Sequence, residues 1–311
     1  MVYSLELKSL DEIKQGEKKM VKKKVTKYVV GDVYSLVDEF LSKHRKENFK
    51  ITGIEFSNLG AQGRTPLFDA THNKKGIIMA YWKDELQSCI VITAPEPGYE
   101  IKAPKCLWHF FDEQKNSCFR PAYLDVSHLD VSKSTDFGYC FTGFGFGFGE
   151  KTKDIITSKI IGLETWDVSN GKNFAGMFFK AFPHSSDVCL DLSSWKFSKA
   201  CRSTLYGLFE DFAEKASKVE LKLDWDTSNV TRFKKMFNGF APMAEDVKII
   251  GIENWAVGQA ECFDGMFKNF AQKSNCKLDL TSWSKDHPLL ADHYSFSENL
   301  FFRIKEPVWV N

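Results

Sequence analysis

Cysteine and histidine are the residues of this sequence best suited to metal binding and nucleophilic chemistry, yet their spacing indicates neither. No two cysteines form CxxC, and the seven histidines form neither HxxxH nor HExxH. Zinc and redox sites need such short spacings, because several side chains must reach one centre. We therefore expect no metal, no cofactor and no catalytic residue, and we expect reduced, buried thiols that pack as small apolar side chains. The cysteines are Cys89, Cys106, Cys118, Cys140, Cys189, Cys201, Cys262 and Cys276.

An alternating run of phenylalanine and glycine, FTGFGFGFG, covers residues 141–149. It contains neither GxGxxG nor GK[ST], so it does not match a phosphate-binding loop. Phe146 and Phe148 lie beyond the apolar pattern of the surrounding chain. If exposed, they form an apolar patch of the kind that marks protein interfaces; the alternative is that they fill a local core beneath a loop. Both are candidate partner-binding residues.

Clustered lysines near the N-terminus form a second candidate binding site. Clustered cations raise the local concentration of anions, so this patch could contact phosphate or an acidic partner. The net charge of the chain is only +1, and no aromatic residue interleaves the run as stacking on bases would require. Direct nucleic-acid binding is therefore expected only through this patch, with a solvated edge as the alternative. The patch comprises Lys18, Lys19, Lys22, Lys23 and Lys24.

A repeat of about 30 residues must position these candidates. Anchor residues recur at separations of 37, 29, 30, 30 and 28 residues, and such a period is typical of solenoids. An apolar–x–apolar triplet precedes each anchor and predicts a strand with one buried face. The anchors are Leu129, Trp166, Trp195, Trp225, Trp255 and Trp283, and the triplets are Leu124/Val126, Ile161/Leu163, Leu190/Leu192, Leu221/Leu223, Ile250/Ile252 and Leu278/Leu280.

A short helix is predicted after each anchor. Apolar residues recur there at i, i+3, i+4 and i+7, as in Phe233/Met236/Phe237/Phe240, which is the pattern of one buried helix face. Each unit is then a strand, a turn, a short helix and a return loop, and the strands of stacked units form a parallel sheet. This packing accounts for the 28 phenylalanines. The predicted N-caps are Ser132, Ser169, Ser198, Ser228, Gly258 and Asp286.

The repeat resembles a known family. WDTSNVTRFKKMFNGF at 225–240 and LDLSSW at 190–195 are similar to the BspA-type leucine-rich repeat, also called the bacterial surface protein 26-residue repeat. The resemblance covers about 105–311 and implies a leucine-rich-repeat-like solenoid with a binding role and no catalytic residues. Units of about 29–30 residues are longer than is usual in the family. Members of this family are typically exported surface proteins.

Three regions follow from these patterns, and the predicted fold class is α/β. Residues 1–75 form a small α/β module, with strands at 25–30 and 51–56 and a helix capped by Asp32. Residues 76–104 form a β-hairpin cap, since GIIMAYWKDELQSCIVI at 76–92 has the form of two strands. Residues 105–311 form the solenoid of about six units, of which the last is a degenerate cap.

Composition supports a globular protein, with 43% hydrophobic and 27% charged residues. No apolar window is long enough to span a membrane and no signal peptide is present, so we expect a cytoplasmic protein. The expected function is non-enzymatic recognition of a protein or ribonucleoprotein complex. One alternative is a phage- or mobile-element-encoded, anti-CRISPR-like inhibitor that occludes a host defence complex. The other is a bacterial surface adhesin whose export signal lies outside this sequence.

Overall fold

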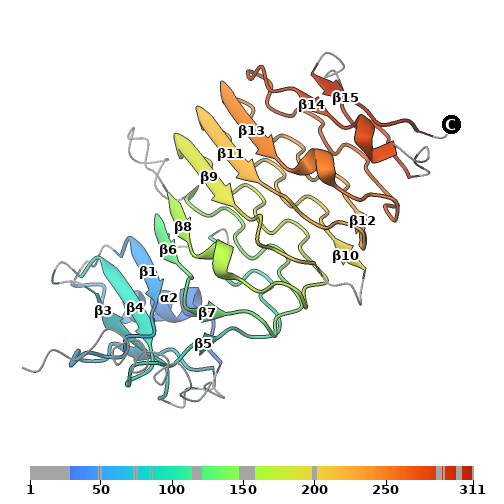
Figure 1. The fold of residues 1–311 in the computed structure, drawn as a ribbon. Helices are drawn as coiled ribbons and strands as arrows, with labels where there is room; N and C mark the ends of the chain where they lie inside the picture. Colours follow the sequence, from blue (N-terminus) through green and yellow to red (C-terminus); the bar gives the residue numbers. More distant parts are fainter. Residues whose placement is uncertain are drawn as a thin grey trace, which may run out of the picture.

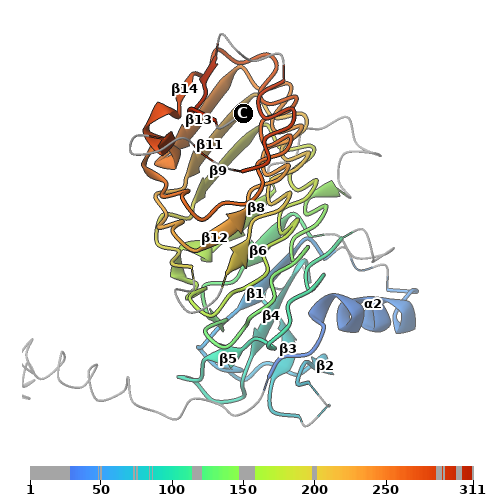
Figure 2. The ribbon, with the colours of Figure 1, turned by 90° about the vertical axis from the view of Figure 1, so that its right-hand side faces the viewer.

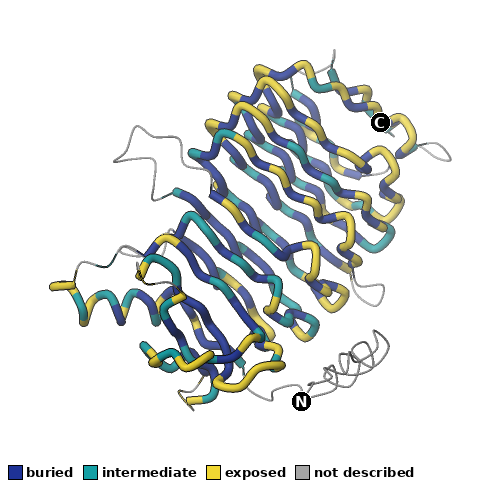
Figure 3. Tube along the Cα trace, turned by 60° about the vertical axis from the view of Figure 1, so that its left-hand side comes forward, coloured by how far each residue is buried: buried dark blue, intermediate teal, exposed yellow. Residues whose placement is uncertain are grey.

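The computed structural model describes residues 29–309, except for residues 48, 50, 73, 75, 84, 86, 114–120, 147–157, 198–201, 285–288, 290 and 299–302. The structure is mixed α/β, with many short strands and mostly parallel pairing. Strands lie side by side in an order that largely follows the chain, from the cyan N-terminal end to the red C-terminal end (Figure 1). Buried residues line the inside of the successive repeat units, and exposed residues occupy their outer corners (Figure 3).

The helix α2 spans Val33–Lys43 and begins at the predicted cap. The Asp32 side chain accepts a hydrogen bond from the Ser35 N–H at 3.2 Å, which satisfies a donor of the first helical turn. The Tyr34 ring meets Phe111 of the repeat region at a centroid distance of 5.6 Å. The helix therefore packs its apolar face against the part of the strand array that lies nearest the N-terminus of the chain (Figure 2). Its buried residues are Val33, Tyr34, Val37 and Phe40.

The first sheet contains the predicted hairpin and the first repeat strands, in the order β2-β3-β4-β1-β6-β8. The antiparallel pair β3 and β4 confirms the hairpin. Strand β1 pairs in parallel with both β4 and β6, so the sheet crosses residues 75 and 104, and the division into domains there stays a prediction. The strands are β1 (Gly53–Phe56), β2 (Phe68–Asp69), β3 (Met79–Trp82), β4 (Cys89–Thr93), β6 (Tyr123–Asp125) and β8 (Lys159–Ile161).

The next three repeat strands form a parallel sheet in the order β13-β11-β9. They are β9 (Asp187–Asp191), β11 (Lys218–Lys222) and β13 (Asp246–Ile250), and their alternate residues are buried. Three smaller parallel pairs are β5 (Ile101–Lys102) with β7 (Leu129–Asp130), β10 (Ser203–Thr204) with β12 (Val230–Arg232), and β14 (Leu278–Asp279) with β15 (Ile304–Lys305). Short 3-10 helices occur at η2 (Leu163–Thr165), η3 (Ile252–Asn254) and η4 (Thr281–Ser284).

Two strands lie one residue out of the predicted register. The triplets placed Ile161 and Ile250 on the buried face, and this was wrong. Ile249 pairs with Leu221 and is buried, whereas Ile250 is 44% exposed. In β8, Ile160 is the buried residue. A shift of one residue exchanges the two faces of a strand.

In these two units, two residues instead of one separate the successive buried side chains, and a glycine at the second of them accommodates the longer spacing. Gly162 and Gly251 follow the strands with φ of 92° and 94°, in the left-handed region that suits glycine. A side chain on Gly251 would come within 2.7 Å of the Asp224 Cα. The buried partners Leu163 and Ile252 then return to the predicted positions.

The segments after the anchors are overlapping turns rather than the predicted helices. In the unit at 233–241, the N–H groups of Asn238 and Phe240 donate to carbonyls three residues earlier. The N–H groups of Lys235 and Phe237 instead donate to carbonyls of the following unit. An α-helix would direct all of these donors to its own carbonyls. Alternate donors of each turn segment therefore tie one unit to the next.

The predicted burial pattern survives in this turn geometry. Phe233, Met236, Phe237 and Phe240 are all fully buried. Turns of about four residues place the same positions inside as a helix does, so periodicity alone does not separate the two. The backbone takes left-handed conformations that a helix excludes, with φ of 56° at Lys235, 66° at Gly239 and 45° at Ala241.

The predicted serine caps are also corrected. The backbone N–H groups of Ser132, Ser169 and Ser228 donate to the carboxylate two residues earlier, at 2.9, 3.0 and 3.1 Å. These are Asx turns that reverse the chain after the strand. Ser198 and Asp286 lie outside the described residues.

The cysteine prediction holds only in part. The six described cysteines are free thiols, but Cys106 and Cys189 are exposed and only Cys140 is fully buried. The prediction that Cys106 and Cys189 are buried was wrong, because both occupy outward-facing positions of their repeat units. Cys118 and Cys201 lie outside the described residues.

Aromatic ladders fill the core. Five tryptophans donate an indole hydrogen bond to a carbonyl of the preceding unit, as Trp225 does to Leu192 at 2.6 Å. Rings also stack from unit to unit, and the Trp225 and Trp255 centroids lie 5.6 Å apart with 8° between their planes. One continuous ladder has centroid separations of 5.3–5.6 Å and runs through Phe111, Phe141, Phe178, Phe209, Phe237 and Phe267.

Replacement of a ladder tryptophan tests this packing. Trp225→Phe removes the donor to the buried Leu192 carbonyl and leaves a cavity, so we expect the free energy of unfolding to fall by about 2–4 kcal/mol. The matched control is Trp108→Phe at a site that is 45% exposed, where we expect less than about 0.5 kcal/mol. Urea denaturation measures both, and equal losses would contradict the role of the ladder.

Candidate functional site

Most residues of the two sequence-predicted sites lie outside the described residues: Phe148 and the lysines Lys18, Lys19, Lys22, Lys23 and Lys24. Phe146 is described and half-buried. Its ring lies 6.0 Å from that of His184, measured between centroids. Phe146 therefore rests partly against the return loop of the next unit, and its role as a partner-binding residue stays a prediction.

A buried carboxylate that the sequence did not reveal holds the middle of the phenylalanine–glycine run. Glu113 is 1% exposed, and its two oxygens accept the N–H groups of Gly145 at 2.9 Å and Phe146 at 3.1 Å. Charge-assisted hydrogen bonds of this kind are stronger than neutral ones. Glu113 thus fixes the backbone at the middle of the run. No local pattern marks this residue, because its partners lie more than 30 residues away.

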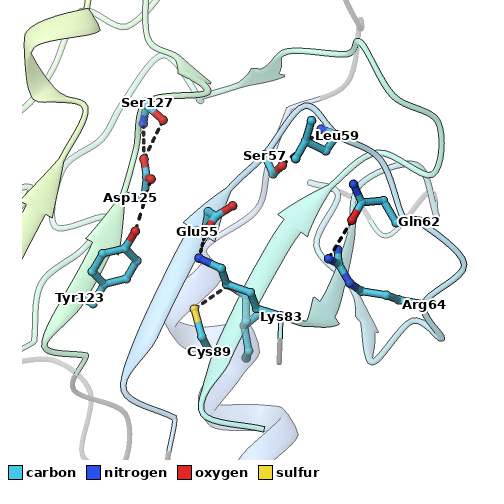
Figure 4. A network of polar contacts seen from close by, with 11 residues as sticks. Glu55, Ser57, Leu59, Gln62, Arg64, Lys83, Cys89, Tyr123, Asp125 and Ser127 are labelled. Atoms are coloured by element: carbon cyan, nitrogen blue, oxygen red, sulfur yellow. Dashed lines mark hydrogen bonds and ion pairs between the residues drawn. The ribbon is translucent and has the colours of Figure 1, made fainter. Parts of the chain in front are cut away.

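Titratable side chains gather on the outward side of the first sheet (Figure 4). We call the outward sides of this sheet and of the sheet formed by β9, β11 and β13 the sheet face. Glu55 of β1 forms an ion pair with Lys83, whose ammonium lies 5.7 Å from the centre of the Tyr123 ring. The hydrogen bond from Lys83 to Glu55 raises the pKa of Lys83, and burial raises the pKa of Tyr123. Both shifts favour a charged amine and a neutral phenol, so neither group is activated as a nucleophile.

The sheet face of β9, β11 and β13 largely neutralises its own charge. Lys222 pairs with Asp191 at 3.0 Å, and Lys218 approaches Asp246 at 3.9 Å. The Ser193 hydroxyl and then Lys222 hold the pKa of Asp191 below its usual range. Exposed pairs of this kind contribute little to stability, but they leave little net charge for a partner.

A second surface, the turn face, is formed by the outward side chains of the turn segments and of the parallel bridges that precede them. A groove of about 630 Å³ crosses several units there. Lys234 pairs with Asp264 at 3.4 Å, and Arg202 outside the groove pairs with Glu261. Arg232 is exposed within the groove. The lining residues are Ala175, Thr204, Tyr206, Arg232, Lys234, Glu261, Cys262, Asp264 and Asp292.

A smaller pocket of about 250 Å³ lies at the edge of the first units. Its lining includes Glu100, Asp130 and Asp167. The Asp130 and Asp167 carboxylates accept the backbone N–H groups of the following Asx turns. Within the described part of the chain, no group of three or more histidine, cysteine, aspartate or glutamate side chains is placed to hold a metal ion. No described helix has the length and apolarity to cross a bilayer.

Removal of the buried carboxylate tests its role. Glu113→Ala leaves the N–H groups of Gly145 and Phe146 without their acceptor, so we expect the free energy of unfolding to fall by about 1.5–3 kcal/mol. Glu164→Ala is the matched control, because Glu164 is exposed and should change stability by less than about 0.5 kcal/mol. Chemical denaturation measures both variants, and a Glu113→Ala variant as stable as the control would contradict the assignment.

Comparison with known proteins bears on the repeated part of the chain. No curated protein matches the sequence, and no solved structure matches it. Residues 124–221 and 204–300 both match one family, described as Mycoplasma protein of unknown function, DUF285. Together the two matches span more than half of the 311 residues and contain all five tryptophan anchors. The chain therefore belongs to the DUF285 family.

Proposed function

We propose that this protein is a non-enzymatic recognition protein that binds a protein, alone or within a ribonucleoprotein complex, through the turn face of a leucine-rich-repeat-like solenoid. The finer family assignment in this proposal is the BspA type. It is supported by WDTSNVTRFKKMF at 225–237, which combines the aromatic anchor, the Ser-Asn turn and the Met-Phe pair within the segments that match DUF285.

The pairing of successive units supports a solenoid. Parallel bridges connect Asn173 to Thr204, Arg232 to Cys262, and Cys262 to Asp292. Partners in each bridge are about 30 residues apart, which is one repeat. A stack of this kind presents an extended, rigid surface, and such surfaces in repeat proteins bind macromolecules.

The proposal rests chiefly on the groove on the turn face. It combines a half-buried tyrosine, Tyr206, with the exposed guanidinium of Arg232. Tyrosine and arginine are enriched among the residues that dominate binding energy at protein interfaces. Polar and charged residues border them, as at the rim of an interface.

Charge reversal in the groove tests the proposal. We expect Arg232→Glu to reduce capture of the partner from a lysate of the source organism by at least about tenfold, a loss of roughly 1.4 kcal/mol or more. Quantitative mass spectrometry of the retained proteins measures the loss against wild-type protein. Tyr206→Ala should reduce capture of the same partner.

Lys248→Glu supplies the matched control, because Lys248 is an exposed residue of the sheet face. We expect this variant to retain the partner at the wild-type level, and all three variants to unfold near the wild-type midpoint. Equal retention by every variant, or loss only with Lys248→Glu, would contradict recognition through the turn face.

A further inference from the structure

Three aromatic side chains cluster at the N-terminal end of the turn face, outside the groove. We call Trp108, His109 and Tyr139 the aromatic platform. The Trp108 and Tyr139 centroids lie 5.1 Å apart with 65° between the planes, and His109 stacks on Tyr139 at 5.1 Å and 14°. Trp108 is 45% exposed, although it belongs to a chain whose repeat tryptophans are buried. The core therefore does not account for this ring.

Glycines of the following units make room for two of these rings. A Cβ atom on Gly138 would lie 2.5 Å from a carbon of the Trp108 indole, and a Cβ atom on Gly176 would lie 2.5 Å from a carbon of the Tyr139 ring. Real Cβ atoms do not approach a ring so closely, so each ring rests directly on glycine backbone. His109 is further held by its contact with the buried Asp112 carboxylate. The platform is therefore fixed before any ligand arrives, which lowers the entropic cost of binding.

An amide beside the indole and a carboxylate bonded to that amide are held in fixed orientations. Asp136 Oδ1 accepts the Gly138 N–H at 3.0 Å and the Asn173 side-chain N–H at 2.9 Å. Asn173 Oδ1 accepts the Ala175 N–H at 3.0 Å. The Asn173 amide nitrogen lies 2.9 Å from the same Cβ position on Gly138 that the indole approaches. The amide and the indole are thus immediate neighbours.

The Asp136 and Asn173 side chains each have a hydrogen-bonding group that these bonds do not use. A carboxylate has two acceptor oxygens and a primary amide has two N–H donors. No described residue donates to Asp136 Oδ2, and the Asn173 amide has a second N–H beyond its bond to Asp136. Both side chains are only half-buried. The amide donor therefore stands beside an exposed indole, and the carboxylate acceptor is bonded to that amide.

We propose that the aromatic platform, with Asp136 and Asn173, is a binding site for a neutral pyranose ring of a saccharide. A pyranose has an apolar C–H face that packs on an aromatic ring, and hydroxyls at its edge that both donate and accept. A hydroxyl can donate to Asp136 and a neighbouring one can accept from Asn173. This site borders the proposed protein-binding groove at Ala175, whose N–H binds Asn173 Oδ1, but it uses none of the side chains that line the groove and does not depend on binding there.

Charge and hydrogen bonding favour this ligand over the other occupants of an aromatic surface. The Asp136 carboxylate repels the carboxylate of an acidic sugar. A proline-rich peptide also docks on aromatic side chains, but its free backbone groups are mostly carbonyl acceptors that cannot pair with a carboxylate. A neutral saccharide satisfies both the carboxylate and the amide.

Titration of the full chain with β-1,4-linked trisaccharides of glucose and of N-acetylglucosamine tests the proposal, with calorimetry as the readout. We expect saturable binding of at least one of the two, insensitive to added salt. Trp108→Ala should weaken it by at least about tenfold. Gly138→Ala keeps every platform side chain but places a methyl group where the indole rests, so we expect a similar loss.

Gly258→Ala is the matched control, because a Cβ atom there meets no atom within 4 Å and the backbone is not left-handed. We expect its affinity to lie within about twofold of wild type. Arg232→Glu should likewise bind the trisaccharide normally, which separates this site from the protein-binding groove. Absence of binding to both trisaccharides at millimolar concentration would overturn the proposal. So would equal affinity of all variants, or binding of a polyproline peptide in place of the saccharides.

Discussion

The spacing between neighbouring strands is the constraint on which this structure depends. Hydrogen-bonded strands lie about 4.8 Å apart, whereas packed helices need about 8–10 Å. When the strands of neighbouring units pair, the segments on the opposite side of those units must also lie about one strand spacing apart. The overlapping turns do so, because alternate N–H groups bind the following unit. Stacked phenylalanine rings, 5.3–5.6 Å apart along the central ladder, match the same spacing.

This constraint also explains where sequence reasoning succeeded and where it did not. The period, the tryptophan register, the hairpin and the Asp32 cap were predictable, because each is a local pattern of side-chain types. The predicted helices were wrong, since turns of about four residues bury Phe233 and Phe237 just as a helix would. The register of β8 and β13 was misjudged because Gly162 and Gly251 each absorb a residue through a left-handed backbone.

The candidate sites were less predictable than the fold. Glu113 receives hydrogen bonds from residues more than 30 positions away, and no spacing rule reveals such a partner. Trp108 lies outside the register of the tryptophan anchors, but no pattern in the sequence shows what its ring contacts. The position of the ring depends on Gly138 in the next unit, where the missing side chain makes room for it. Surface chemistry in a stack arises between units, so it becomes visible only when the units are placed side by side.

The two faces differ in the side chains that they present. On the sheet face, Lys222 and Asp191 pair across adjacent strands, and Lys83, which follows β3, pairs with Glu55 of β1. On the turn face, the residue types change from unit to unit, from the indole of Trp108 through Tyr206 to Arg232. The ladders inside hold both faces at the same repeat spacing. Variation on the turn face therefore changes the chemistry presented without changing the scaffold.

Residue-resolved native-state hydrogen exchange tests whether bonds between units hold the turn segments together. We expect the N–H groups of Gly207, Phe209 and Asp211, which donate to the following unit, to exchange only through global unfolding. Their exchange free energies should then equal the free energy of unfolding and share its denaturant dependence. Rapid exchange of these three amides, independent of denaturant, would show that the bonds between units do not hold the turn segments.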